Sequence, residues 1–173
     1  MKIIAKNIGK IFERNWKTSC PDWLLVHKPP DAAQSFNMSN NLRFSQHSPC
    51  DYMMFNGNTG IFYTLELKSF EGSCSFERTK EEKGIIHFHQ IESLKKFATY
   101  TNVISGFILD FRKSDTTYFL SIADFCRLID NISKKSFNEN DLIQWCNPIK
   151  IHKKKLKVNY RYDIETFLED SVL

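Results

Sequence analysis

Apolar residues recur at helical spacing in several parts of this chain. Across residues 5–18 they form one stripe, with lysines and an arginine around the rest, as in an amphipathic helix packed on a core. The same spacing follows His87, continues beyond Ile122, and returns in the last residues of the chain. A short helix or turn is expected at 138–145. The pattern therefore predicts helices at both ends of the chain and between the strands.

Strand-like segments separate these helices. Residues 103–111 are almost continuously apolar, as in a strand that is buried on both faces. Residues 61–68 alternate instead, so that one face is wholly apolar and the other carries Glu66 and Lys68. Further strands are expected at 23–26, 51–55 and 116–121. This order predicts a single α/β domain, residues 1–173, with a mixed central β-sheet flanked by helices.

Two polar segments interrupt the periodic pattern. Residues 27–49 contain three prolines and several Asn and Ser residues, which indicates a long excursion from the sheet. A segment of this length without periodicity is usually functional or mobile in a compact domain. Residues 69–84 mix charges of both signs, so we expect a solvated loop there.

Charge and cysteine content indicate what kind of partner and what cellular compartment the protein has. The 173 residues carry a net charge of +4, a mild basic excess that is compatible with a polyanionic partner without requiring one. Five cysteines form no C-x-x-C pair, and an odd number cannot all pair within one chain, so we expect reduced thiols. No apolar run approaches the roughly 18–20 residues needed to span a bilayer. We therefore expect a cytoplasmic protein without membrane contact.

Candidate chemistry is concentrated between Cys50 and Lys68. Asp51 opens one strand, residues 56–58 supply turn chemistry, and Glu66 and Lys68 lie near the end of the next strand. Mg²⁺ usually takes one or two carboxylates together with water and a phosphate oxygen. A neighbouring lysine can orient the attacking water or offset charge in the transition state. These residues predict metal-assisted phosphodiester cleavage, with Asp51 and Glu66 as metal ligands, although the pattern alone is weakly specific.

Two further polar residues lie at the edges of predicted helical faces. Glu13 follows the apolar Phe12, so its carboxylate could point into an active site or pair with a lysine at the surface. Gln90 borders the face that contains Leu94 and Phe97, and a polar amide there needs partners. It could bind a catalytic carboxylate or water, or it could be a satisfied core glutamine.

Cations gather in the excursion and near the end of the chain. The excursion carries His27, Lys28, Arg43 and His47. They could contact nucleic acid or could belong to a solvated loop. Residues 150–157 hold five lysines in eight positions, among them Lys153, Lys154 and Lys155. Lysines at this density can neutralise several phosphates, or they can protect an edge strand against aggregation.

Five short motifs follow one another along the chain. They are G-x-x-F-E at 9–13, H-K-P-P at 27–30, C-D-Y-x-x-x-x-G at 50–57, E-x-K at 66–68 and H-Q-I-x-x-L at 89–94. The segments GFILDF, TTYFLS and KKSF come after or beside them. In this order and spacing, over nearly the whole chain, they resemble the RecU family of Holliday junction resolvases. That family belongs to the PD-(D/E)XK, restriction-endonuclease-like nucleases.

The resemblance implies a fold and a site. The fold would be restriction-endonuclease-like, with residues 27–49 as a stalk-like protrusion that enters the centre of a four-way DNA junction. Asp51 and Glu66 would bind metal, and Lys68 would be the catalytic lysine. Glu13 would help to hold metal or water, and Gln90 would belong to a His-Gln pair at the start of its helix.

The resemblance also implies a cofactor and partners. The cofactor would be Mg²⁺, with Mn²⁺ as an alternative. Two symmetric nicks in a four-way junction imply a homodimer, with recombinase or branch-migration proteins as further candidate partners. A compact, phage-encoded member of the family would fit this chain.

The leading hypothesis is a Mg²⁺-dependent endonuclease that resolves Holliday junctions by paired symmetric nicks during DNA recombination and repair. One alternative is a nuclease of the same fold that cuts linear duplex DNA. Another is a non-catalytic DNA-binding or recombinase-regulating module. The presence of Asp51, Glu66 and Lys68 together argues against the module, which would gain little from an acid pair at a strand end.

Overall fold

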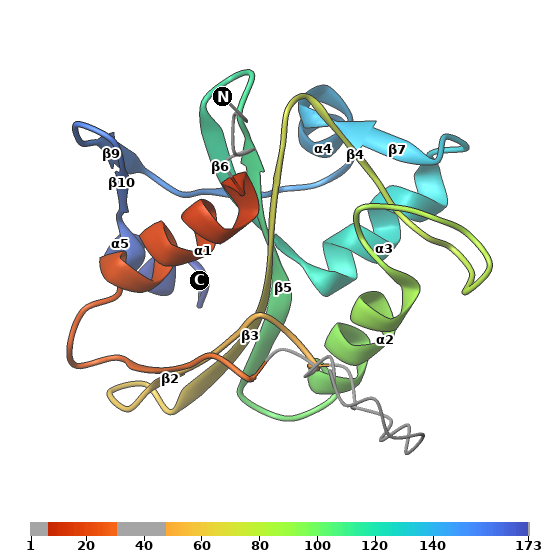
Figure 1. Ribbon diagram of the computed structural model, residues 1–173. Helices are drawn as coiled ribbons and strands as arrows, with labels where there is room; N and C mark the ends of the chain where they lie inside the picture. Colours follow the sequence, from red (N-terminus) through yellow and green to blue (C-terminus); the bar gives the residue numbers. More distant parts are fainter. Residues whose placement is uncertain (1–6, 31–47, 173) are drawn as a thin grey trace, which may run out of the picture.

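The computed structural model describes residues 7–30 and 48–172 of the chain. Its centre is a sheet with the strand order β1-β2-β3-β5-β6-β8 (Figure 1). Its strands are β1 (Leu25–His27), β2 (Tyr52–Asn56), β3 (Ile61–Phe70), β5 (Val103–Phe111), β6 (Thr116–Ser121) and β8 (Ile149–Lys150). The β3–β5 pair is parallel and the remaining neighbours are antiparallel, so the sheet is mixed.

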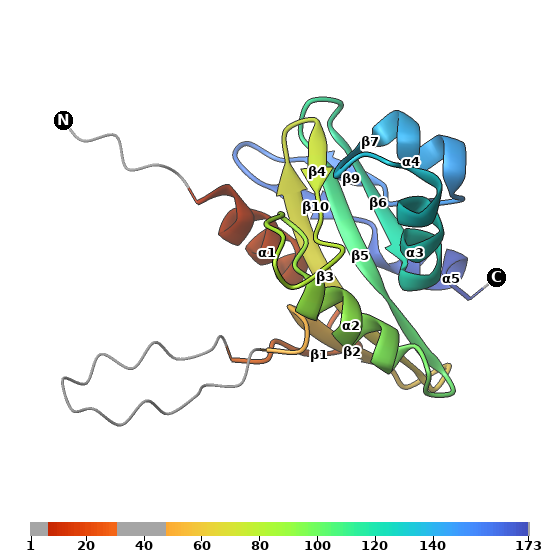
Figure 2. The ribbon, with the colours of Figure 1, turned by 90° about the vertical axis from the view of Figure 1, so that its right-hand side faces the viewer.

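Helices cover both faces of this sheet (Figure 2). One face packs against α1 (Ile8–Ser19) and α5 (Ile164–Asp170). The other packs against α2 (Phe88–Phe97), α3 (Ile122–Asn131) and α4 (Glu139–Trp145). The predicted α/β class, with a mixed central sheet flanked by helices, is therefore confirmed. No helix in the described part of the chain is long and apolar enough to cross a bilayer.

Two small two-stranded antiparallel sheets complete the structure. Strand β4 (Ser73–Ser75) pairs with β7 (Ser136–Asn138), and β9 (Lys153–Lys155) pairs with β10 (Tyr160–Tyr162). The expectation of a solvated loop at 69–84 is wrong for its first half, since β4 lies there and Cys74 and Phe76 are buried. The strand is three residues long and its partner lies far along the chain, so no local pattern could indicate it.

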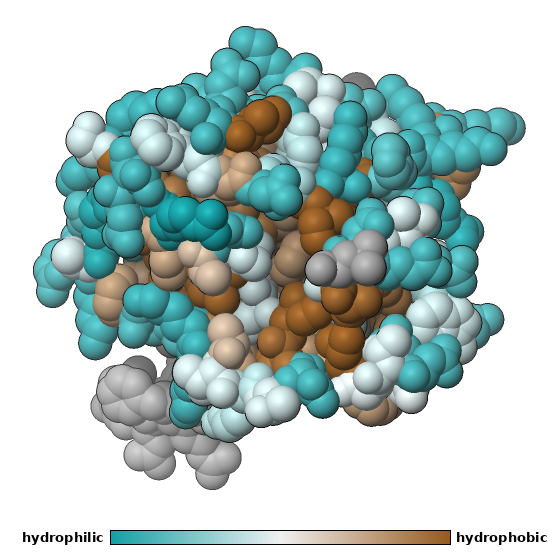
Figure 3. Space-filling view, turned by 180° about the vertical axis from the view of Figure 1, so that it is seen from behind, coloured by the Kyte–Doolittle hydropathy of each residue, from teal (hydrophilic) through white to brown (hydrophobic). Residues whose placement is uncertain are grey.

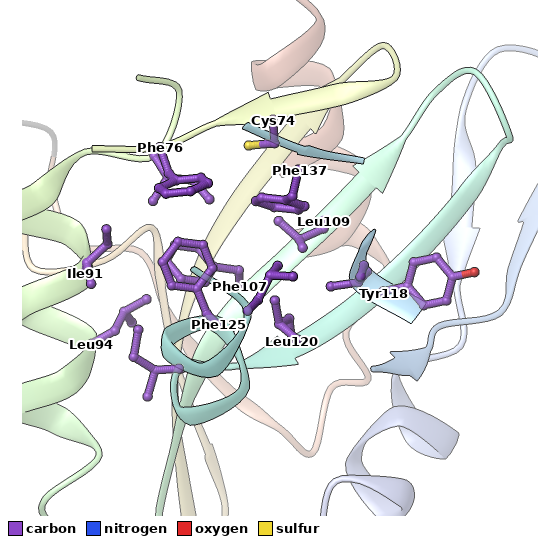
Figure 4. Close-up of a cluster of buried hydrophobic side chains, with 14 of the residues drawn as sticks. Cys74, Phe76, Ile91, Leu94, Phe107, Leu109, Tyr118, Leu120, Phe125 and Phe137 are labelled. Atoms are coloured by element: carbon purple, nitrogen blue, oxygen red, sulfur yellow. The ribbon is translucent and has the colours of Figure 1, made fainter. Parts of the chain in front are cut away.

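Strand β3 contributes side chains to both sides of the sheet. Tyr63, Leu65 and Leu67 belong to the core beneath α1 and α5. The alternate residues face α2 and α3, where Phe107, Phe125 and their neighbours form a second core (Figure 4). Glu66 and Lys68 are among these alternate residues, so they lie on the α2 side of the sheet.

The predicted excursion is only partly described. The structure covers the two ends of the proposed stalk, residues 27–30 and 48–49, whereas its residues 31–47 lie outside the described part of the chain. The turn from β2 to β3 is well defined. There Gly60 has a φ of 71°, which favours glycine, and Gly60 N–H donates to Asn56 O at 2.8 Å. This short connection makes β2 and β3 direct neighbours.

Candidate active site

Strand pairing places Asp51 beside Glu66. In the β2–β3 ladder Tyr52 is opposite Leu65, so the preceding residue, Asp51, is next to Glu66 on the neighbouring strand. Asp51 N–H donates to Leu65 O at 3.1 Å, and Leu67 N–H donates to Asp51 Oδ2 at 2.8 Å. The backbone of β3 therefore holds both the main chain and the side chain of Asp51.

Glu66 is buried in a polar cluster on the α2 face. The residue is 3% exposed, and its Oε1 accepts hydrogen bonds from Lys68 Nζ, at 2.9 Å, and from Gln90 Nε2. Lys68 lies two residues further along β3, on the same face. The three residues that the sequence placed in a candidate site, Asp51, Glu66 and Lys68, are thus brought together.

The start of α2 determines how Gln90 is oriented. Its Oε1 accepts a hydrogen bond from His87 N–H at 3.0 Å, as part of a capping box. The amide nitrogen is therefore turned away from the helix end and donates to Glu66. The sequence left two interpretations open for Gln90. The structure agrees with the first, in which its amide binds a carboxylate.

Glu13 approaches the same cluster from α1. Its Oε2 is 2.5 Å from Lys28 Nζ, and its backbone oxygen accepts a hydrogen bond from the Tyr52 hydroxyl at 3.1 Å. Glu13 pairs with a lysine, and its charge also helps to raise the pKa of Asp51. Lys28, expected to contact DNA, lies next to the site rather than on a remote loop.

The cluster carries more negative charge than its surroundings can easily solvate. Burial, and then the charge of Glu66, raise the pKa of Asp51 to about 7, although the Leu67 N–H and Lys68 act in the opposite direction. Burial, Glu66 and Asp51 also raise the pKa of the neighbouring Cys50 thiol to about 12. Cys50 is therefore protonated at neutral pH, which argues against a role as a thiolate ligand or nucleophile.

The donor set suits a hard cation. Within the described part of the chain, Asp51 Oδ1 and Glu66 Oε2 form no hydrogen bond, so each carboxylate keeps one oxygen for a ligand. Among these residues no group of three or more His, Cys, Asp or Glu side chains could hold a metal. Two carboxylates completed by water and a substrate phosphate are the ligands that Mg²⁺ accepts. The residues present therefore fit the cation that the sequence predicted.

The residues expected to bind DNA have different outcomes. Arg43 and His47 lie outside the described residues. Lys154 and Lys155 are exposed, as a phosphate contact requires. The assignment of Lys153 needs correction: its side chain is 8% exposed, and its Nζ lies 2.9 Å from carboxylate oxygens of Asp110 and Asp115. Because two acids and the protein body enclose this ammonium, Lys153 is a structural cation rather than a surface one.

Sequence reasoning missed Glu77, which stabilises the segment that leads into α2 and so supports the site indirectly. The residue is buried, and its carboxylate accepts hydrogen bonds from Gly84 N–H at 3.1 Å and Phe88 N–H at 2.8 Å. It also lies 2.8 Å from His87 Nδ1. These contacts hold the first turn of α2, which carries Gln90. No local signal distinguishes Glu77 from the other charged residues of 69–84.

Fold and site together define an α/β protein with a mixed central sheet, in which two carboxylates and a lysine meet where β2 and β3 pair. The chain belongs to the RecU family: the family model described as Recombination protein U matches residues 20–165.

Two known proteins are similar to this chain. One is an SPbeta prophage-derived uncharacterized protein, YotM, of Bacillus subtilis (strain 168), with 30% identity over 171 residues, 91% of this chain and 83% of that protein. Its prophage origin agrees with the expectation of a phage-encoded member. The other is the solved structure of Archaeoglobus fulgidus Hjc, a Holliday junction resolvase from an archaeal hyperthermophile. It has a TM-score of 0.48 and 16% identity, and the match covers 82% of this chain and 95% of that one.

Proposed function

We propose that this protein is a Mg²⁺-dependent endonuclease that resolves four-way DNA junctions by paired symmetric nicks. The observation that carries the proposal is the carboxylate pair of Asp51 and Glu66, each with one oxygen left for a ligand and with Lys68 beside them. Membership of the RecU family supports DNA recombination as the setting. Mn²⁺ is an alternative cation, because it prefers the same oxygen ligands.

Each residue of the site has a distinct task in phosphodiester hydrolysis. When bound, the cation supplies Lewis-acid assistance to the scissile phosphate. Asp51 and Glu66 would hold it, and Gln90 keeps Glu66 in one rotamer through Oε1. Lys68 uses one N–H for Glu66, and its other N–H groups can orient a water or meet the charge that develops on the phosphate oxygens. Glu13, next to Lys28, can accept a proton or a water contact at the rim.

Paired nicks require two copies of this site. We therefore propose a homodimer whose two-fold axis matches the symmetry of the junction. Recombinase and branch-migration proteins are the partners that would supply or process such junctions. Selectivity would rest on junction shape and phosphate positions more than on base edges.

A non-catalytic DNA-binding module is the less favoured alternative. Burying two carboxylates side by side raises the pKa of Asp51 and so destabilises the fold at neutral pH. A surface that only binds phosphate would be weakened by this carboxylate pair, since carboxylates repel phosphate. A metal-dependent site explains the pair directly.

Cleavage of matched substrates tests the proposal. The protein is incubated with Mg²⁺ and either a synthetic four-way junction or a linear duplex of the same sequence. Asp51→Asn and Glu66→Gln are compared with Glu92→Gln, which removes an exposed carboxylate on α2 that pairs with Lys95. We expect paired nicks in the junction alone, lost in both site variants and retained in the control.

Two other outcomes would overturn parts of this proposal. Equal cutting of junction and linear duplex would favour the linear-duplex nuclease. DNA binding without metal-dependent cutting would favour the non-catalytic module.

A further inference from the structure

The β9–β10 hairpin extends from the body of the protein next to α1 (Figure 1). Its strands carry Lys154 and Lys155, both exposed. The connecting turn holds two exposed aliphatic residues, Leu156 at 45% and Val158 at 77%, on either side of Lys157. Val158 is the most exposed large hydrophobic residue in the described part of the chain. Seen from behind, the outer margin of the molecule on the side of this hairpin is largely hydrophilic (Figure 3).

This hairpin is held firmly in place. Lys153 reaches from β9 to Asp110 of β5, and its Nζ lies 4.7 Å from the centre of the Tyr160 ring. On β10, Tyr162 N–H donates to Ser19 Oγ of α1 at 2.9 Å. At the tip, Leu156 N–H donates to Asn159 O at 2.7 Å and closes the turn. The hairpin is therefore fixed to the same helix that presents Glu13 to the candidate active site.

The lysines of the hairpin differ in how their charge is used. Two aspartates neutralise Lys153. Lys154, Lys155 and Lys157 form no ion pair within the described residues, so three positive charges face solvent. Exposed lysines without an ion-pair partner, at this density, suit a polyanion, and DNA is the polyanion that the proposed function brings to this part of the surface.

We propose that the β9–β10 hairpin is a DNA-binding arm outside the catalytic site, and this inference rests on the proposed function. Lys154, Lys155 and Lys157 contact backbone phosphates of a duplex arm. Leu156 and Val158 lie against the sugars and base edges of its minor groove, a surface that aliphatic side chains commonly meet in DNA complexes. The anchored geometry holds the duplex at a constant position relative to α1 and hence to Glu13.

Two other partners are less well suited to this tip. A membrane anchor buries a larger apolar face than two aliphatic side chains on a tight turn provide. A second copy of the chain would meet three like charges with the same three charges, which opposes a symmetric contact through the tip.

Binding without catalysis tests this arm. Affinity for a duplex and for a four-way junction is measured in EDTA across a series of salt concentrations. We compare Lys154→Ala/Lys155→Ala, Leu156→Ser/Val158→Ser, and the control Lys134→Ala/Lys135→Ala. The control removes the same charge near the end of α3, on the opposite side of the molecule (Figure 1). Melting curves verify that each variant is folded.

The expected results separate charge from apolar contact. Loss of Lys154 and Lys155 should reduce the slope of log affinity against log salt by about 2, since each neutralised phosphate contributes about 0.9. Loss of Leu156 and Val158 should weaken binding several-fold with the slope unchanged. The control should bind as the wild type does.

Contrary results are equally distinct. If the wild type cuts junctions and both hairpin variants bind DNA as tightly as the control does, the proposed DNA-binding arm is wrong and the proposed function is unaffected. If the wild type cuts no DNA but Lys154→Ala/Lys155→Ala binds DNA more weakly than the wild type, the DNA-binding arm is supported and the proposed nuclease function is wrong. Tip-dependent binding to anionic vesicles, or tip-dependent self-association, with DNA affinity unchanged would also overturn the proposal.

Discussion

The sheet carries a buried carboxylate–lysine cluster on each of its two faces, and the two clusters differ in one respect. On the α1 face, Asp110 Oδ1 accepts from Thr117 Oγ1 at 3.0 Å and Lys153 Nζ at 2.9 Å. Its Oδ2 accepts from Ser69 Oγ at 2.8 Å. Both oxygens of Asp110 are thus satisfied, and among residues 7–30 and 48–172 the only other carboxylate at this cluster is the exposed Asp115, across Lys153.

The cluster on the α2 face is incomplete. Asp51 and Glu66 lie side by side next to Lys68, and each keeps an oxygen that forms no hydrogen bond within the described residues. The pKa of Asp51 is raised in consequence of burial and of Glu66. Similar residue types therefore produce a closed structural network on one face and, on the other, an open cluster that a cation would complete.

Replacing the two lysines should separate these roles most clearly. Lys68→Met should lower the rate of junction cutting by about 10²–10³, the usual effect of removing one group that stabilises transition-state charge. Lys153→Met should lower the cutting rate of the folded protein far less, because Lys153 lies on the opposite face and acts only through the hairpin. Single-turnover rates at saturating protein measure both. A Lys68→Met protein that cuts at the wild-type rate would remove Lys68 from the mechanism.

Stability tests the structural role of Lys153. Lys153→Met leaves the buried Asp110 without its charged partner, and breaking a buried pair costs about 3–5 kcal/mol of unfolding free energy. Urea unfolding at pH 7 measures the loss. Lys154→Met, the exposed neighbour on β9, is the matched control and should change stability by less than about 0.5 kcal/mol. Equal effects of the two substitutions would show that Lys153 does not anchor the hairpin.

Sequence patterns predicted the open cluster but not the closed one, and chain distance explains why. Asp51 directly precedes β2, and Glu66 lies on β3, which a short turn joins to β2, so the local pattern is enough to pair them. Asp110 and Lys153 are 43 positions apart, and their contact depends on how the hairpin folds back over β5. Lys153 was accordingly interpreted as a DNA contact together with its exposed neighbours.

The same distinction applies to the fold. The bounds of β5 and β6 agree with the predicted strands because each strand is one continuous segment of the sequence. The β4–β7 pair joins two three-residue strands on either side of two longer strands and two helices, so only the tertiary fold brings them together. The same holds for Glu77. Its carboxylate accepts hydrogen bonds from backbone N–H groups of residues further along the chain, which only the folded structure brings to it.

Without metal, the open cluster should destabilise the protein in a pH-dependent way. The pKa of Asp51 is raised from 3.8 to about 7, so the folded state holds a proton that the unfolded state releases between these values. Stability should therefore fall as the pH rises from 4 to 7. Asp51→Asn removes this term and should be more stable than the wild type above pH 7, by about 2–4 kcal/mol.

Chemical unfolding in EDTA at pH 4.5 and pH 8 tests this expectation. The advantage of Asp51→Asn should be small at the lower pH and full at the higher one, and saturating Mg²⁺ should reduce or reverse it. Asp22→Asn, at an exposed position before β1, is a control for the loss of one acid. If the stability difference between Asp51→Asn and the wild type were the same at both pH values, the pKa of Asp51 would not be raised by burial and by Glu66.

The smallest effect should come from Gln90, which touches the cluster without carrying charge. Gln90→Met keeps the length of the side chain but removes the donor to Glu66 Oε1 and the acceptor for His87 N–H. Outer contacts of this kind usually change metal affinity by about 10–100-fold. We therefore expect a higher Mg²⁺ requirement, with most of the maximal cutting rate recovered at high Mg²⁺. Ser93→Ala, one turn further along α2, should leave the Mg²⁺ requirement unchanged. If Gln90→Met instead lowered the maximal rate at every Mg²⁺ concentration, Gln90 would contact the reacting groups themselves, and the open cluster would extend onto α2.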